Sequence, residues 1–268
     1  MWLLESAPGL PRDGPISFGD LGAGTCAACL GARYALRDHS GGDHPYVCWP
    51  IDVASSSARF AEAFSAMVAT AAGLNTRDAL LPLQSASQYL TEEADGVDHL
   101  VTSMLRQVAQ RGARQPHVIL ASFSLHYLKG PARAAFYELL AAAIRRPLLL
   151  LIIKGVDSVR KHQTGGMVPD SVPSVFLGIH YYLGKDPKPR VVEAHVALIR
   201  PAAQHVAVST GEQPRAALDE LPDLDHPDAW VLATFAAVQR RYERDGLHTG
   251  VTDLAVAEKR QALASAYL

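Results

Sequence analysis

Short apolar runs alternate along the chain with stretches in which apolar residues recur at helical spacing. This alternation is typical of βαβ units, in which parallel strands form a sheet and helices cover its faces. The most apolar run, Pro147–Lys154, is almost entirely Leu and Ile, which indicates a central strand buried on both faces. The pattern therefore predicts an α/β fold.

The strands and helices of this first part can be placed from the same pattern. Strands are expected at Ile16–Leu21, Tyr46–Val53, Ala79–Leu83, His117–Ala121 and Pro147–Lys154. Helices are expected from Cys26 to about Leu36, after Ser55, over Val97–Val108 and from Pro131. Asp38–Pro45 is rich in turn residues and is expected to be a loop.

The alternation of strand and helix patterns ends after Lys154. Val175–Leu183 and Val191–Ile199 have strand patterns with no helical pattern between them, so they are expected to form an antiparallel hairpin. We predict a Rossmann-like seven-stranded, mostly parallel sheet with helices on both faces and this hairpin at its C-terminal end. Residues 1–201 would form that domain, and residues 202–268 a helical extension packed on it, with helices near Pro227 and after Thr252.

Composition narrows the classes of function. The chain has 268 residues and a net charge of −2, without the basic excess that most nucleic-acid-binding proteins carry, so a nucleic-acid partner is not expected. The longest apolar run, Pro147–Ile153, is too short to span a membrane, and no signal segment is evident. Three cysteines are too few for a disulfide framework and suit the reducing cytoplasm.

The chemistry of the chain is concentrated where the first strand ends. Gly22 and Gly24 allow a tight turn and a close approach of a ligand to the backbone, and the turn leads into a helix N-terminus that favours polar or anionic groups. Asp52 ends the second strand, where a carboxylate can accept hydrogen bonds from the hydroxyls of a ribose. Together these features predict a nucleoside site.

By spacing alone, Gly22-x-Gly24-x-x-Ala27 also satisfies the looser fingerprint of dinucleotide-binding proteins. Asp20 stands two residues before Gly22, where that class would have an apolar residue. The fourth strand runs into the polar and aromatic segment Ser122–Leu128, and the chain closes with the hairpin. These features favour a different nucleoside.

With these motifs the sequence resembles the class I S-adenosylmethionine-dependent methyltransferases over roughly Ile16–Pro201. Asp20–Thr25 looks like their first motif, Asp52 matches their ribose-binding acid, His117–Leu128 looks like their fourth-strand motif, and the hairpin is their characteristic addition to the sheet. The resemblance implies an enzyme whose cofactor is S-adenosylmethionine.

The resemblance also implies roles for individual residues. Those expected at the methionine portion of the cofactor are Asp20, Gly22, Ala23, Gly24 and Thr25. Asp52 would bind the ribose, Val53 would flank the adenine, and Ser85 (or Gln84 or Ser87) would meet the adenine amino group. Ser122 and Phe123 would line the site near the sulfonium.

The sequence departs from the family in three places. Cys26 stands where glycine is more common, and the gap before Asp52 is long. Little chain precedes the first strand, so substrate contacts must come from 74–112, from 155–173, from the terminal helices or from a partner subunit. In a homodimer, the partner subunit would supply these substrate contacts.

Methyl transfer needs mainly the positioning of an acceptor against an already activated methyl group, and a general base only for a protonated acceptor. His126 and Tyr127, just beyond the fourth strand, are the candidates for acceptor contact or proton removal. For His126, a packing role against the start of the next helix is favoured over the catalytic one.

The expected reaction transfers the methyl group to an O or N atom of a small molecule. An RNA or protein methyltransferase is the alternative, which clustering of Arg106, Arg111, Arg114, Arg145 and Arg146 on the rim of the pocket would favour. A nicotinamide-dependent oxidoreductase predicts further parallel strands after Lys154, and a non-catalytic nucleoside-binding protein needs a blocked pocket. A zinc site from Cys26, Cys29, His39, His44 and Cys48 is not expected, because the first two fall in a helix.

Overall fold

The structure is a computed structural model of the chain, and it describes part of the chain. The described residues are 2–11, 16–24, 27–40, 46–52, 63, 67, 70, 84–85, 115–128, 130–155, 167–181, 190–202 and 227–245.

Within these ranges the strands form one seven-stranded sheet in the order β3-β2-β1-β4-β5-β7-β6. Their bounds are β1 Ile16–Leu21, β2 Tyr46–Asp52, β3 Gln84–Ser85, β4 Val118–Ser122, β5 Leu148–Gly155, β6 Ser174–Tyr181 and β7 Arg190–Ile199. The helices are α1 Trp2–Glu5, α2 Ala27–Ser40, the 3₁₀ helix η2 Leu125–Tyr127, α5 Gly130–Ala143 and α8 Pro227–Asp245.

The sheet is mixed. β1 pairs in parallel with both β2 and β4, and β4 pairs in parallel with β5. β7 runs antiparallel to both β5 and β6. The predicted α/β fold is thus confirmed, and the sheet, which was predicted to be mostly parallel, is mixed. From β1 the chain moves first toward β2 and β3 and then back across to β4, so the topology switches between β1 and β4.

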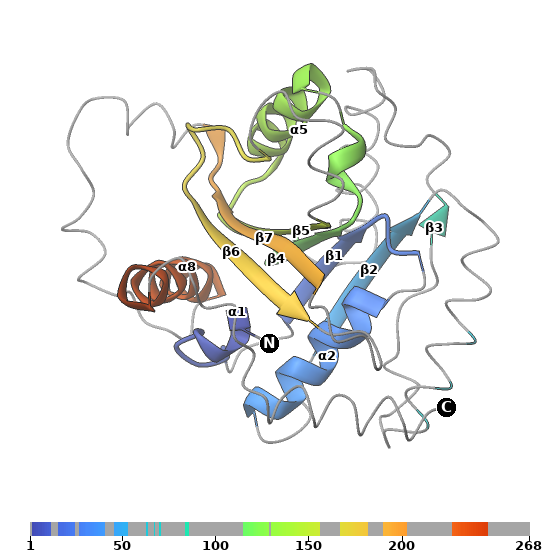
Figure 1. The fold of residues 1–268 in the computed structure, drawn as a ribbon, viewed down its shortest axis with the longest axis vertical. Helices are drawn as coiled ribbons and strands as arrows, with labels where there is room; N and C mark the ends of the chain where they lie inside the picture. Colours follow the sequence, from blue (N-terminus) through green and yellow to red (C-terminus); the bar gives the residue numbers. More distant parts are fainter. Residues whose placement is uncertain are drawn as a thin grey trace.

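Helices lie on both faces of the sheet (Figure 1), and an apolar layer packs between the sheet and the helices on each face. On one face Phe18 and Leu149 pack with Trp230 of α8 and with residues of α1 and α2. On the other face Leu150 and Ile152 pack with Phe136 of α5. Neighbouring residues of a strand point to opposite faces, so the continuous Leu/Ile run of β5 supplies both layers at once.

Two elements differ from the sequence prediction by more than two residues at a boundary. α2 continues to Ser40, past the predicted end near Leu36, because its last turn lies at the surface, with His39 half-buried and Ser40 exposed. The strand that pairs with β2 consists of Gln84 and Ser85. The predicted range for it, 79–83, lies outside the described residues.

The termini of the described chain meet on the α2 face of the sheet. α1 buries Leu3 and Leu4 in the same apolar layer as Trp230 and Val231 of α8 (Figure 1). The helices predicted over 97–108 and after Thr252 lie outside the described residues, as does most of the helix predicted after Ser55. Among the described helices, none has the length and apolar character needed to cross a membrane.

Candidate functional site

The turn that follows β1 has a backbone that ordinary side chains disfavour. Gly22 has φ +69° and Gly24 has φ +52°, both in the left-handed region that glycine enters without steric cost. A Cβ built at Gly24 meets no atom within 4 Å, so the backbone there is open to an approaching group. The two predicted glycines therefore form a tight turn at the carboxyl end of β1.

Gly22 brings the first motif against the segment that follows β4. A Cβ at Gly22 would lie 2.8 Å from the Cβ of Ser124, closer than real side chains approach one another. The Ser124 side chain is 2% exposed, and among the described residues its Oγ has no hydrogen-bond partner. An unpaired polar atom thus lies buried beside the glycine turn.

Phe123 is strained and exposed at the same place. Its φ is +55°, a conformation that is uncommon for any residue other than glycine and costs about 1–3 kcal/mol. Its backbone N–H donates to the carbonyl of Ile153 in β5 at 2.7 Å, which fixes the strained residue at the strand end. The side chain is nevertheless 45% exposed, although an aromatic ring is expected to be buried.

Asp20 lies under the turn. Its side chain is only 1% exposed and is directed to the α2 face, where its Oδ2 lies 3.2 Å from the Sγ of Cys29. Cys29 is disulfide-bonded, which departs from the expectation drawn from the low cysteine count. Ala23, between the two glycines, is also buried.

The ends of β2 and β3 adjoin those of β1 at the same edge of the sheet. Asp20 is in register with Pro50, Leu21 with Ile51, and Asp52 with Ser85. The backbones of the two predicted binding residues Asp52 and Ser85 are thus direct neighbours. Val53 and Thr25, and the side chains of Asp52 and Ser85, lie outside what the structure describes.

His126 and Tyr127 lie in η2, the single turn between β4 and α5. Arg133 of α5 holds this turn, since its guanidinium donates a 2.7 Å hydrogen bond to the carbonyl of Leu128. Burial lowers the pKa of Arg133 and raises that of its neighbour Tyr137. His126 is half-buried, and the Tyr127 side chain lies outside the described part. Neither residue is shown to contact a substrate, and their catalytic role stays a prediction.

Sequence reasoning missed a polar cluster beside this edge. Lys154 of β5 forms a 2.7 Å ion pair with Glu193 of β7, and His195 follows on the same face. Burial, and then the charge of Lys154, lower the pKa of His195 to about 4, while Glu193 opposes them. Polar residues at alternate positions of an otherwise apolar strand were the available signal.

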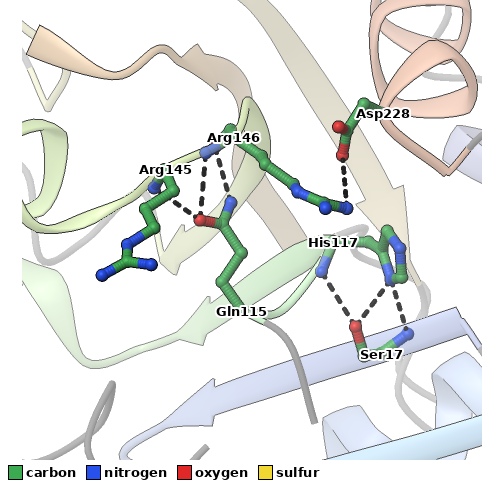
Figure 2. Close-up of polar contacts among 6 residues, drawn as sticks. All are labelled: Ser17, Gln115, His117, Arg145, Arg146 and Asp228. Atoms are coloured by element: carbon green, nitrogen blue, oxygen red, sulfur yellow. Dashed lines mark hydrogen bonds and ion pairs between the residues drawn. The ribbon is translucent and has the colours of Figure 1, made fainter. Parts of the chain in front are cut away.

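A second polar cluster lies at the opposite, amino-terminal edge of β4 and β5 (Figure 2). The Ser17 N–H donates to Nδ1 of His117 at 3.0 Å, and the Ser17 Oγ lies 2.6 Å from the same nitrogen. Burial lowers the pKa of His117 to about 4, with the charge of Asp228 opposing it. Two contacts on one ring nitrogen, at the residue directly before the central strand β4, indicate that this histidine has a structural role.

Arg145 and Arg146 belong to this amino-terminal cluster. Their backbone N–H groups both donate to the Oε1 of Gln115, and the Arg146 guanidinium lies 3.5 Å from an oxygen of Asp228 (Figure 2). Both therefore lie away from the glycine turn. Arg106, Arg111 and Arg114 lie outside the described residues.

Within the described ranges, no three His, Cys, Asp or Glu side chains gather as metal ligands would. Cys26 and His44, two members of the zinc alternative, lie outside these ranges. A disulfide sulfur is not a thiolate, so the oxidised Cys29 does not offer the ligand that such a site needs.

No protein-family model matches the sequence, and no curated protein does. Among solved structures, the chain is similar to a protein from Listeria monocytogenes described as a class I S-adenosylmethionine-dependent methyltransferase, with 11% identity, a TM-score of 0.44, and coverage of 75% of this chain and 58% of that one. It is also similar to a predicted O-methyltransferase from Agrobacterium tumefaciens, with 13% identity, a TM-score of 0.42, and coverage of 74% and 79%.

An rRNA methylase from Streptococcus thermophilus is a third such structure, with 11% identity, a TM-score of 0.37, and coverage of 74% and 93%. At these identities and TM-scores, the similarities do not decide what this chain binds or which reaction it performs. Its function has to be argued from the site itself.

Proposed function

We propose that the chain is an S-adenosylmethionine-dependent methyltransferase that methylates an O or N atom of a small molecule. The observation that carries the proposal is the left-handed turn at Gly22 and Gly24, closed against Ser124 where the topology switches between β1 and β4. Ligands of open α/β sheets bind outside the carboxyl ends of the strands at such a switch point.

The residues present fit a nucleoside of this kind. The backbone at Gly24 is open, the Ser124 hydroxyl is buried without a partner among the described residues, and Asp52 ends β2 next to Ser85. The antiparallel pairing of β7 with β5 supports S-adenosylmethionine over a nicotinamide, because dinucleotide-binding folds continue with parallel strands.

The roles of the residues follow from this placement. In the proposal, the segment from Asp20 through Gly22, Ala23 and Gly24 to Thr25 holds the methionine portion of the cofactor. Asp52 accepts hydrogen bonds from the ribose hydroxyls, Val53 flanks the adenine and Ser85 meets its amino group. When bound, the cofactor supplies a methyl group on positively charged sulfur.

The protein's own part is positioning and exclusion of water. Ser122 and the exposed ring of Phe123 stand at the edge of β4, where an acceptor can be held against the methyl group. His126, on the turn that Arg133 holds, is the candidate for removing a proton from an acceptor hydroxyl or ammonium.

A small molecule is favoured as the acceptor over RNA or protein. Arg145 and Arg146 would support a nucleic-acid substrate if they lined the rim of the glycine turn. They instead lie at the amino-terminal edge of the sheet, with Arg146 paired to Asp228 (Figure 2). The two arginines of the predicted rim that the structure describes therefore lie away from the candidate site.

Calorimetric titration of the purified chain with S-adenosylmethionine, S-adenosylhomocysteine and NADH tests the proposal. Both sulfur nucleosides are expected to bind with micromolar affinity and NADH is not. Asp52→Ala should abolish binding, whereas Asp170→Ala, which changes an exposed carboxylate in the turn before β6, should leave it unchanged. Binding of NADH alone, or of none of the three, would contradict the proposal.

A further inference from the structure

The carboxyl end of β5 has a buried ion pair that the proposed site does not use. Lys154 and Glu193 are directly opposite in the β5–β7 register, and their Nζ and Oε2 atoms lie 2.7 Å apart. Their side chains are only 7% and 20% exposed. Removing two charges from water costs several kcal/mol, which their attraction offsets incompletely, so such a pair contributes little to stability.

His195 extends this cluster. It is two residues from Glu193 on the same face of β7, in register with Ile152 of β5 and Phe176 of β6. The Phe176 and His195 ring centroids are 5.0 Å apart. The Nε2 atom of His195 is buried and has no hydrogen-bond partner among the described residues. A buried polar atom without a partner costs about 1–3 kcal/mol, so this atom lacks a group that would satisfy it.

The cluster adjoins the edge of the sheet where the methyl donor is proposed to bind. The Phe123 N–H donates to the carbonyl of Ile153, the residue before Lys154. Lys154 is therefore one residue away from the point where the strained, exposed Phe123 is attached to β5. The ion pair and His195 lie on the α5 face of β5 and β7, and β5 pairs directly with this end of β4.

We propose that Lys154, Glu193 and His195 form the subsite that binds the hydroxyl group of a phenolic methyl acceptor, an inference that rests on the proposed function. A hydroxyl both donates and accepts, so it satisfies Nε2 in either neutral tautomer of the ring. The Phe176 ring beside the imidazole provides an aromatic contact for the acceptor.

The charges of the cluster select among acceptors. The lowered pKa of His195, about 4, keeps the ring neutral at pH 7 and able to share a proton with a hydroxyl. The Glu193 carboxylate is already paired with Lys154, so it is not free to bind the ammonium group of an amine acceptor.

Nitrogen-detected NMR of the histidine side chains of the full-length protein tests this subsite with phenol and toluene as probes. Toluene has the same ring without the hydroxyl. Phenol is expected to shift the Nε2 resonance of His195 saturably, and toluene is not. His117 is the internal control, because its pKa is also lowered to about 4 but its Nδ1 is already bonded to Ser17. Its resonances should stay in place with either probe.

A His195→Phe variant keeps the aromatic volume and removes the nitrogen. It should bind phenol about tenfold more weakly, as expected for the loss of one buried hydrogen bond. An unmoved His195 resonance, equal shifts of His195 and His117, or unchanged phenol affinity in the variant would overturn the inference. If the variant does not fold, the wild-type spectra still decide.

The proposed function and this inference can fail separately. Binding of S-adenosylmethionine without any effect of phenol on His195 overturns the subsite alone. A phenol-induced shift of His195 in a chain that does not bind S-adenosylmethionine overturns the proposed function, while the hydroxyl-binding role of the cluster stands. Failure of both measurements overturns both.

Discussion

The Ser124 side chain occupies the space that a side chain at position 22 would need, since a Cβ there would lie 2.8 Å from the Ser124 Cβ. Residues about a hundred positions apart in the sequence thus meet at the switch point of the sheet. The contact links the glycine turn after β1 to the segment after β4, and it makes glycine necessary at position 22 for two independent reasons, φ and space.

Gly22→Ala should therefore be more costly than Gly24→Ala. Both substitutions put a Cβ on left-handed backbone, at about 1–2 kcal/mol. Only the first also overpacks against Ser124, which adds about 1–3 kcal/mol. Denaturant unfolding measures both, and adding Ser124→Gly to Gly22→Ala should recover the overpacking part. Equal costs for the two glycines would refute the contact.

Phe123→Asn should leave stability unchanged or raise it by up to about 1 kcal/mol. Asn tolerates left-handed φ better than Phe does, and the lost ring is already 45% exposed. The same variant should bind S-adenosylmethionine more weakly, because the ring is proposed to line the site. Melting temperature and calorimetry report the two effects. A loss of 3 kcal/mol or more in the free energy of unfolding, about that of truncating a buried Phe, would show that the ring is packed in the protein rather than exposed.

Stability should fall as the pH is lowered from 7.5 to 5.5. His117 and His195 have folded-state pKa values lowered to about 4 from 6.5, so in this range the unfolded chain takes up protons that the folded chain does not. Each histidine then lowers the free energy of unfolding by at most about 1.4 kcal/mol over this range. The contribution of the two rings to stability is complete only above pH 6.5, the pKa of the unfolded state. Urea unfolding at both pH values measures the loss.

The control for this pH dependence is a variant with both rings replaced by Asn. Its stability at pH 7.5 will differ from that of the wild type, so the quantity to compare is the change between the two pH values. The loss of stability between pH 7.5 and 5.5 should be smaller in the variant than in the wild type, by most of the amount that the two histidines contribute. An undiminished change would assign the pH dependence to other groups.

α8 should be held by Trp230 rather than by its ion pair. Trp230 is fully buried and meets the His117 ring edge-on, with centroids 6.5 Å apart. Trp230→Ala should cost about 3–5 kcal/mol of the free energy of unfolding. Asp228→Ala should cost less than about 1 kcal/mol, because the Arg146–Asp228 pair is about one-third exposed on both sides.

Trp230→Phe refines this test. The Trp230 Nε1 has no hydrogen-bond partner within the described residues, so its removal breaks no hydrogen bond there and loses only apolar contacts. The loss in the free energy of unfolding should therefore be well below that of Trp230→Ala. An Asp228→Ala variant less stable than Trp230→Ala would reverse the assignment.

The fold was predictable from the sequence where strands are apolar and turns have distinctive residues. β1 has the predicted bounds, Ile16–Leu21, because all six of its residues are buried and a glycine turn ends it. The two-residue strand Gln84–Ser85 has no apolar pattern to reveal it. A strand at the edge of a sheet needs only backbone pairing, which sequence periodicity does not report.

The candidate site was predictable only in its local parts. The glycine turn and the end of β4 could be read from consecutive residues, but the contact between Gly22 and Ser124 could not. Lys154 was read as a residue that ends its strand, whereas the structure shows it in a buried pair with Glu193. Such contacts depend on strand order and register, so the pattern of a single strand does not contain them.

A crystal structure of the chain with S-adenosylhomocysteine tests the central claim most directly. The account predicts that the homocysteine portion lies against the Gly22–Gly24 turn with Ser124 in contact, and that the ribose hydroxyls bond to the carboxylate of Asp52. A ligand bound elsewhere on the chain, or a turn whose backbone the ligand does not approach, would contradict it.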